Sequence, residues 1–362
     1  MRPKRVMTEQ SPEVPTLPVK KRYEWIDNAR IVAAFLIMYV HVPVHLPADA
    51  LVNNGMVYQL VHHTTLCGRV PFFLILAGYF LARNITWSKA WDRFLWLFIP
   101  FAIWNLVFVY PRMVVEHTTY SFLDIMGVGS IFSDTWQFTE RGNCAPILGP
   151  SWFLRDIMVL SLLTPLIIKL KRYLPALLVA WAVIFCAQVE GYTQIVMLSP
   201  STIFFYLFGV CLCEYRISDA YRILNGRFLP VFVIVGVTAL AFCISSSVFH
   251  GMGVPRTLLG MLVGALMIAY TGVIIEKCWP SLSKRLAPLG PACFLVFMLH
   301  KPCFRVMCHF LPDSILQSHW MLLLPIPAFV FICAFFLLMK RYTPCLMPYL
   351  GHMKLPKKAK GQ

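Results

Sequence analysis

The chain has 362 residues, of which 59% are apolar and only 13% charged. Charged residues make up about a quarter of an ordinary soluble domain, so this composition argues against a soluble enzyme of one or two domains. The formal net charge of +16 would suit a nucleic-acid-binding protein. The basic residues, however, lie in short segments between apolar runs, which indicates membrane topology, and we expect no nucleic-acid partner.

Residues 1–22 are polar and rich in proline, and we expect a disordered basic tail without a cleavable signal peptide. Ten apolar runs then predict membrane-spanning helices. They cover residues 30–47, 67–83, 94–111, 152–168, 174–190, 202–215, 228–247, 257–275, 289–310 and 321–339. The sequence therefore predicts an all-α, polytopic membrane helix bundle over residues 23–342, followed by a basic tail over residues 343–362.

The distribution of Lys and Arg predicts the orientation of these spans. Three quarters of the 32 basic residues fall in the two tails and in alternate loops. Basic loops remain in the cytoplasm, so both termini are expected there, in a multi-pass protein of the cell membrane. The longest loop on the opposite side, about residues 112–151, is long enough to suggest a functional role, such as receiving a substrate, although a simple solvated cover is the alternative.

The first apolar run contains two ionisable residues, Arg30 and His41. About three helical turns separate them, so they lie on nearly one face of the helix, roughly 16 Å apart along its axis. Asp27 precedes Arg30 by three residues and is expected to pair with it. Ionisable side chains are costly inside a bilayer, so these three are candidate site residues. Snorkelling of the arginine, or a hydrogen bond from the histidine to a neighbouring helix, are the structural alternatives.

The spacing Asp27-x-x-Arg30-x10-His41 resembles the opening pattern of the membrane-bound acyltransferase 3 family. Residues 70–82 resemble the family's second helix, with Ala77 in place of the usual serine. The small pair Ala77-Gly78 also favours close packing against another helix. Further segments extend the resemblance over about residues 22–340.

Arg93-Phe-Leu-Trp96-Leu-Phe-Ile-Pro100 resembles the family's Arg-x-x-Arg-x-x-x-Pro, with Trp96 in place of the second arginine. In the family these arginines are associated with activity, and the resemblance implies that Arg93 binds the phosphates of acyl-coenzyme A (acyl-CoA). Lys89 lies on the same helix face and is a candidate to replace the missing arginine. A positive-inside anchor is the structural alternative for Arg93.

Two further segments supply candidates for the acceptor side. Residues 151–166 resemble the family's Trp-Phe-Leu stretch and contain Trp152, Arg155 and Asp156. Adjacent helical residues face about 100° apart, so Arg155 and Asp156 are expected to have separate partners instead of pairing together. Residues 291–302 resemble a late helix of the family that ends in a histidine, here His300, which is also a candidate.

No metal site is predicted, because the twelve cysteines and ten histidines lack the spacing of zinc ligands. Of the cysteines, only Cys67 and Cys144 are both expected near the outer face, where they could form a disulfide, but we do not predict one. No tightly bound cofactor is expected, and acyl-CoA enters as a donor substrate.

The resemblance implies an O-acyltransferase that moves an acyl group, most simply acetyl, from cytoplasmic acyl-CoA to a carbohydrate or cell-envelope glycan at a bacterial inner membrane. Imidazole titrates near neutral pH, so His41 suits the role of a base for the acceptor hydroxyl, or of a transient acyl carrier. Acetyl and succinyl both fit as the group transferred. A transporter or flippase for a polysaccharide or lipid-linked sugar would use the same intramembrane polar residues and is the alternative function.

Overall fold

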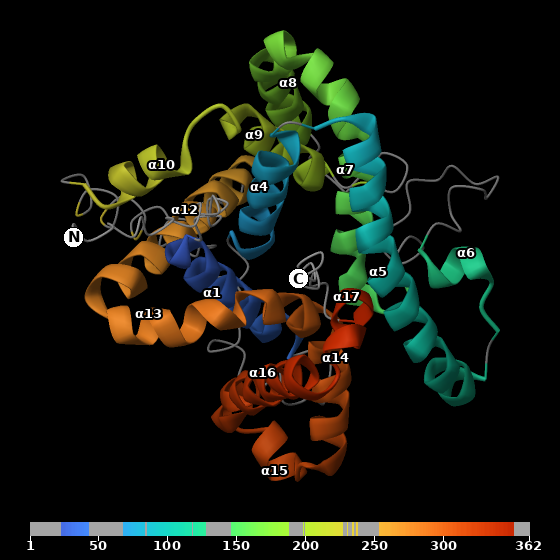
Figure 1. The fold of residues 1–362 in the computed structure, drawn as a ribbon. Coiled ribbons are helices and arrows are strands. Elements are labelled where there is room, and N and C mark those ends of the chain that lie inside the picture. Colours follow the sequence, from blue (N-terminus) through green and yellow to red (C-terminus); the bar gives the residue numbers. More distant parts are fainter. Residues whose placement is uncertain are drawn as a thin grey trace, which may run out of the picture.

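The computed structural model describes residues 23–42, 68–83, 85–117, 119–127, 146–187, 198, 200–226, 230, 234, 237 and 253–350. The elements within these ranges are α-helices and short 3-10 helices. The longer helices are α1 (Glu24–His41), α4 (Arg69–Ala82), α5 (Trp87–Glu116), α7 (Trp152–Lys169), α8 (Leu174–Ala187), α9 (Pro200–Leu212), α12 (Gly253–Cys278), α14 (Cys293–Phe310) and α16 (Pro325–Tyr342). The predicted all-α class is confirmed for the described chain (Figure 1).

Shorter helices connect them. They are α6 (Phe122–Ile125), α10 (Ile217–Leu224), α13 (Pro280–Leu286), α15 (Asp313–Leu316) and α17 (Met347–Leu350). Five 3-10 helices complete the described elements: η3 (Gly149–Ser151), η4 (Lys171–Tyr173), η5 (Ala287–Ala292), η6 (His319–Leu323) and η7 (Pro344–Leu346). Because η5 leads directly into α14, its tight turn fixes where that helix begins.

Several of the helices are suited to cross a bilayer. Within the described residues, five segments are long and apolar enough: Trp87–Val114, Gly149–Lys169, Leu258–Cys278, Pro280–Phe310 and Trp320–Tyr342. Two shorter apolar helices, Arg69–Ala82 and Ser201–Leu212, accompany them. The protein is therefore a multi-pass membrane protein. The predicted span 228–247 lies outside the described residues, apart from three helical positions, so the count of ten stays a prediction.

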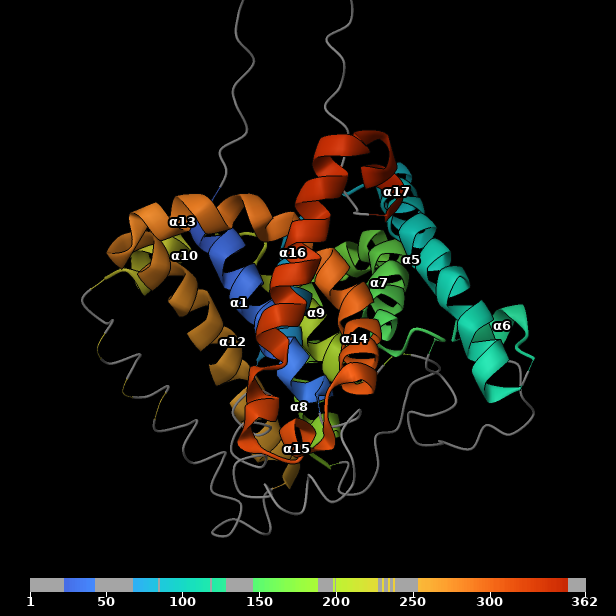
Figure 2. The same cartoon turned by 90° about the horizontal axis from the view of Figure 1, so that it is seen from below.

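The helices in or beside the predicted cytoplasmic loops lie at one end of the bundle, and those in the predicted outer loops lie toward the other end. In Figure 2, α10, α13 and α17, which lie in or beside the predicted cytoplasmic loops, are at one end, and α6 and α15 are toward the other. α1 begins beside α13 and runs toward the α15 end. This arrangement agrees with the alternation of basic loops, and a cytoplasmic location of the α13 end remains our prediction from the positive-inside rule.

Glycines bring the central helices into backbone contact. A Cβ atom on Gly78 of α4 would lie 2.2 Å from the carbonyl oxygen of Tyr206 in α9, and one on Gly209 of α9 would lie 2.1 Å from the carbonyl oxygen of Ile75. Reciprocal contacts of this kind require residues without side chains on both helices. The expectation that Ala77-Gly78 permits close helix packing is therefore confirmed.

Candidate functional site

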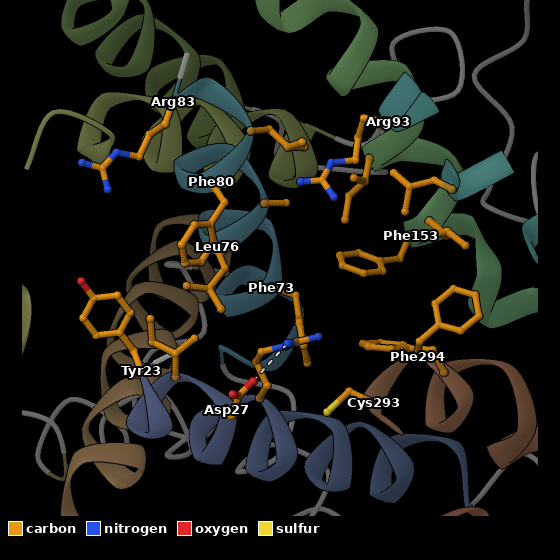
Figure 3. A pocket seen from close by; sticks show the side chains of 18 of the residues that line it. Tyr23, Asp27, Phe73, Leu76, Phe80, Arg83, Arg93, Phe153, Cys293 and Phe294 are labelled. Carbon is orange, nitrogen blue, oxygen red and sulfur yellow. Dashed lines mark hydrogen bonds and ion pairs between the residues drawn. The ribbon is translucent and has the colours of Figure 1, made fainter. Parts of the chain in front are cut away.

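A cavity of about 640 Å³ opens among α1, α4, α5, α7 and α14. Its walls are mostly apolar and aromatic, and its charged lining residues are Asp27, Arg30, Arg83 and Arg93. Figure 3 shows Arg93 projecting from α5 toward the cavity, with Asp27 on the wall formed by α1. We call this space the arginine cavity. A volume of this size is typical of a small-molecule site.

Side chains of the surrounding helices hold two of these arginines in place. Arg30 Nη1 lies 3.3 Å from Asp27 Oδ1, so the predicted pairing within the first turns of α1 is confirmed. Arg83 follows α4, and its Nη1 donates to the Tyr79 hydroxyl at 3.0 Å. The Tyr79 hydroxyl in turn donates to the carbonyl oxygen of Tyr215 at 2.7 Å. Two guanidinium groups thus reach the cavity from separate helices with fixed supports.

Asp27 is held from behind by the backbone of η5. A Cβ atom on Gly290 would lie 2.4 Å from Asp27 Oδ1 and 2.8 Å from its Cγ. Only glycine leaves room for the carboxylate at this position. The close approach of η5 therefore fixes the side chain that orients Arg30.

The two candidate histidines meet deeper in the bundle. The ring centroids of His41 on α1 and His300 on α14 are 4.9 Å apart, with the rings inclined by 40°. His300 is fully buried, and its Nδ1 lies 2.6 Å from the carbonyl oxygen of Val296. A carbonyl oxygen only accepts hydrogen bonds, so Nδ1 carries the proton. In the neutral ring, Nε2 is then the basic nitrogen.

Three phenylalanine rings pack together in the wall of the arginine cavity, and we call them the phenylalanine layer. Phe73, Phe153 and Phe297 line the cavity, and their ring centroids are 5.0 to 6.2 Å apart. His300 follows Phe297 by three residues, about one turn further along the same face of α14. Neither His41 nor His300 is among the residues that line the cavity. The arginine cavity, which Arg30 lines, therefore does not extend to His41.

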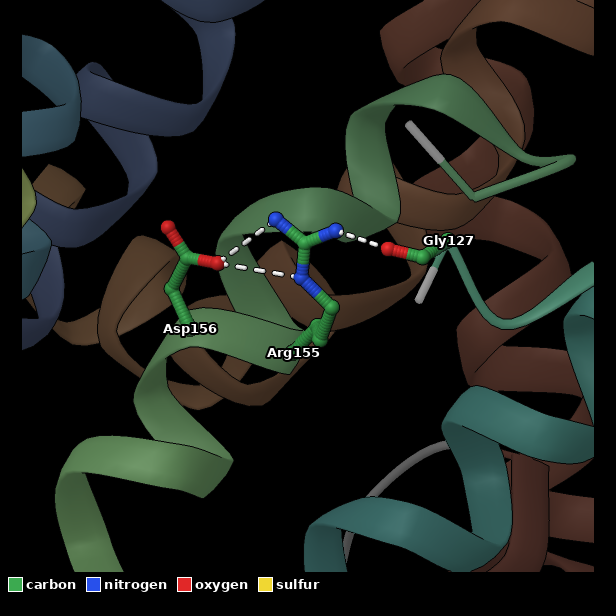
Figure 4. A network of polar contacts seen from close by, with 3 residues as sticks. All are labelled: Gly127, Arg155 and Asp156. Atoms are coloured by element: carbon green, nitrogen blue, oxygen red, sulfur yellow. Dashed lines mark hydrogen bonds and ion pairs between the residues drawn. The ribbon is translucent and has the colours of Figure 1, made fainter. Parts of the chain in front are cut away.

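Arg155 and Asp156 pair with each other, which corrects the prediction that they cannot. Arg155 Nε and Nη2 donate to Asp156 Oδ1 at 3.1 and 2.9 Å, and Nη1 donates to the carbonyl oxygen of Gly127 at 2.6 Å (Figure 4). The arginine side chain is long enough to span the angle between adjacent positions of a helix. Both residues are buried, at 4% and 0% exposure. The hydrogen bond from Arg155 to the carbonyl oxygen of Gly127 links α7 to the residues just after α6.

The other candidates lie apart from the arginine cavity. Trp152 is partly buried, with its ring 6.2 Å from that of Phe153, and does not line the cavity. Lys89 is exposed at the start of α5 and does not line it either. Cys67 and Cys144 are outside the described residues. No group of three potential metal ligands occurs within the part of the chain that the structure describes.

A comparison of the sequence with protein-family models identifies the family of the chain. The model of acyltransferase family 3, described as an acyltransferase domain, matches residues 23–339. The chain belongs to this family. Searches among curated proteins and among solved structures find no match. The matched range includes every described helix that lines the arginine cavity and both histidines.

One cavity residue of this acyltransferase was missed by sequence reasoning. Arg83 counted only as a basic residue of a cytoplasmic loop, yet it lines the arginine cavity together with Arg30 and Arg93. Its position four residues after Tyr79 was the available signal, because a tyrosine one turn earlier on a helix offers its hydroxyl to an arginine. The third guanidinium of the cavity is therefore that of Arg83, immediately after α4.

Proposed function

We propose that this membrane acyltransferase moves an acyl group, most simply acetyl, from cytoplasmic acyl-CoA to a hydroxyl of a carbohydrate or cell-envelope glycan at a bacterial inner membrane. The observation that carries the proposal is the convergence of Arg30, Arg83 and Arg93 on one cavity at the end of the bundle with the predicted cytoplasmic loops. His41 and His300 meet outside that cavity.

Donor binding uses the three guanidinium groups. Coenzyme A carries phosphates, and a guanidinium fork binds phosphate oxygens through two parallel hydrogen bonds. Arg93 provides one fork from α5, and Arg83 supplies the positive charge that Trp96 does not. Arg30, in the second turn of α1 and held by Asp27, binds a donor phosphate or the thioester carbonyl oxygen.

The transfer step takes place at the histidine pair. His41 accepts the proton of the acceptor hydroxyl while the hydroxyl oxygen attacks the thioester carbonyl carbon. A new C–O bond forms and the C–S bond breaks, and the departing thiolate takes the proton from the imidazolium to give the free thiol. His300, fixed by its bond to the Val296 carbonyl, positions His41 for this exchange.

Access to the histidines requires the aromatic layer to open. The acyl end of the donor passes Phe73, Phe153 and Phe297 to reach His41, and the acceptor arrives from the opposite side of the membrane. Only the acyl group then crosses from the donor side of the membrane to the acceptor side.

The proposal is tested with purified protein in lipid nanodiscs and radiolabelled acetyl-CoA. The native protein should transfer label to a glycan acceptor or slowly to water. We expect His41→Ala to lower the rate by about 100-fold or more, the usual contribution of a general base, while donor binding persists. His309→Ala, which removes an exposed histidine at the end of α14, is the matched control and should retain activity.

Full activity of His41→Ala would refute the assignment of the base. Absence of donor binding by the native protein, together with movement of a lipid-linked sugar across the membrane, would favour the transport alternative.

A further inference from the structure

A second cavity, of about 480 Å³, adjoins the arginine cavity. It is formed by α1, α4, α9, α10 and α12, and the two cavities share Ile26, Leu76, Phe80 and Ile217 as a common wall. We call it the apolar chamber. Its volume is within the range of about 300–1,000 Å³ of small-molecule sites.

The walls of the chamber are alkyl and aromatic side chains. They include Phe72, Ile75, Phe208, Leu212, Leu262 and Leu266. Among the described residues that line the chamber, Arg216 alone carries a charge, and it is exposed. A ligand that fits is a hydrocarbon chain with a negatively charged group at one end.

The chamber opens toward lipid. Leu266 on α12 and Ile223 on α10 both line it, and they are 37% and 54% exposed. Leu266 belongs to a segment suited to span the bilayer, so its exposed side contacts hydrocarbon. Phe72 and Tyr79 on α4 both line the chamber, which therefore extends about 10 Å along that helix.

The helix at the rim has the pattern of a helix that lies in the membrane interface. In α10, Ile217 and Leu224 are buried, whereas Asp219 and Arg222 form an ion pair at 3.5 Å on the outer face. Figure 2 shows α10 at the same end of the bundle as α13. An amphipathic helix in this position lies near the phospholipid headgroups, and Arg216 immediately precedes it.

We propose that the apolar chamber binds one acyl chain of an anionic phospholipid from the cytoplasmic leaflet, with the lipid phosphate beside Arg216. This inference does not depend on the reaction that the protein catalyses. The donor's own acyl chain fits less well, because the three arginines for its phosphates lie in the neighbouring cavity and the chamber's mouth faces the bilayer.

A lipid in the chamber would affect the arginine cavity through Tyr79. Tyr79 lines the chamber, and its hydroxyl accepts the hydrogen bond from Arg83 while donating to the Tyr215 carbonyl. A chain packed against the Tyr79 ring therefore supports the residue that fixes Arg83. Loss of the lipid is expected to weaken donor binding without touching the histidines.

The experiment uses the full-length protein in phosphatidylcholine nanodiscs that contain a small fraction of phosphatidylglycerol with a photoactivatable diazirine in one acyl chain. After illumination, mass spectrometry maps the labelled peptides. We expect label on chamber residues of α4, α9 and α12. Ala220→Trp, which places an indole at the rim from α10, should reduce that label at least fivefold, and Ala269→Leu should do so from α12.

Ala176→Trp is the matched control, because Ala176 is exposed on α8 and does not line the chamber. Arg216→Gln should abolish the preference for the phosphatidylglycerol probe over a phosphatidylcholine probe with the same diazirine chain. Label that is equal in native protein and in both filling variants, or spread evenly over exposed helix faces such as that of Val330 on α16, would overturn the site. Equal labelling of the native protein by the two probes would overturn the role of Arg216.

Discussion

The contact between Gly290 and Asp27 allows the role of Arg30 to be tested without changing either charged residue. In Gly290→Ala, the new methyl group would lie 2.4 Å from Asp27 Oδ1, whereas ordinary contacts begin near 3.4 Å. The carboxylate must therefore move by about 1 Å. Arg30 Nη1 and Asp27 Oδ1 are 3.3 Å apart, so a movement of this size away from Arg30 would break the ion pair.

The expected cost follows from the exposure of the pair. The Asp27 side chain is 12% exposed and that of Arg30 is 34% exposed, so their interaction is partly screened by solvent and contributes about 1 kcal/mol. If Arg30 binds the donor only when held in this way, the KM for acyl-CoA should rise about fivefold. The rate at saturating donor should change less, because the histidines are unaltered.

The assay is a donor titration of the transfer rate, accompanied by thermal unfolding in detergent to confirm that the protein is folded. Gly149→Ala is the matched control, since its methyl group would meet only the end of the flexible Lys301 side chain, at 3.2 Å. Asp27→Asn should reproduce the higher KM, and the double variant should be no worse than either single one. An unchanged KM in Gly290→Ala, or additive effects in the double variant, would refute the reasoning.

Two further predictions concern stability. Asp156→Ala removes the carboxylate that pairs with the buried Arg155 guanidinium and should lower the free energy of unfolding by about 3 kcal/mol. Replacing both residues with apolar ones should restore much of that free energy. Denaturant unfolding measures the two variants, and an equal loss of stability in the single and the double variant would contradict the argument. Gly78→Leu places a side chain against the Tyr206 carbonyl oxygen and should lower the free energy of unfolding by about 2 kcal/mol or more. The effect is measured as a lower melting temperature, and an unchanged melting temperature would show that α4 and α9 are not held by this contact.

The sequence predicted a helix in each apolar run that the structure describes, because hydropathy and length determine which segments suit a bilayer, whereas the number of spans stays a prediction. It also predicted the Asp27–Arg30 pair, since residues three apart on a helix are neighbours whatever surrounds them. Both properties are local. The same local reasoning failed for Arg155 and Asp156, because the rule for adjacent residues neglects the reach of a long arginine side chain.

The cavity and the histidine contact depend on tertiary packing and could not be predicted. Arg83 lines the cavity only because the end of α4 is close to α1 and α5. His41 meets His300 only because α1 packs beside α14, and nothing in either segment specifies that neighbour. The phenylalanine layer likewise combines side chains of three helices.

Backbone contacts explain how a bundle in lipid holds such a site. Lipid chains are as apolar as helix surfaces, so hydrophobic burial contributes little to helix association and close packing must supply the specificity. The first turns of α1 are held on one side by Gly272 of α12, where a Cβ atom would lie 2.2 Å from the Trp25 carbonyl oxygen, and on the other by Gly290 of η5. Asp27 makes the contact with Gly290, and Arg30 follows it by three residues on the same helix. The position of the guanidinium therefore depends on the absence of a side chain at two positions that do not line the arginine cavity.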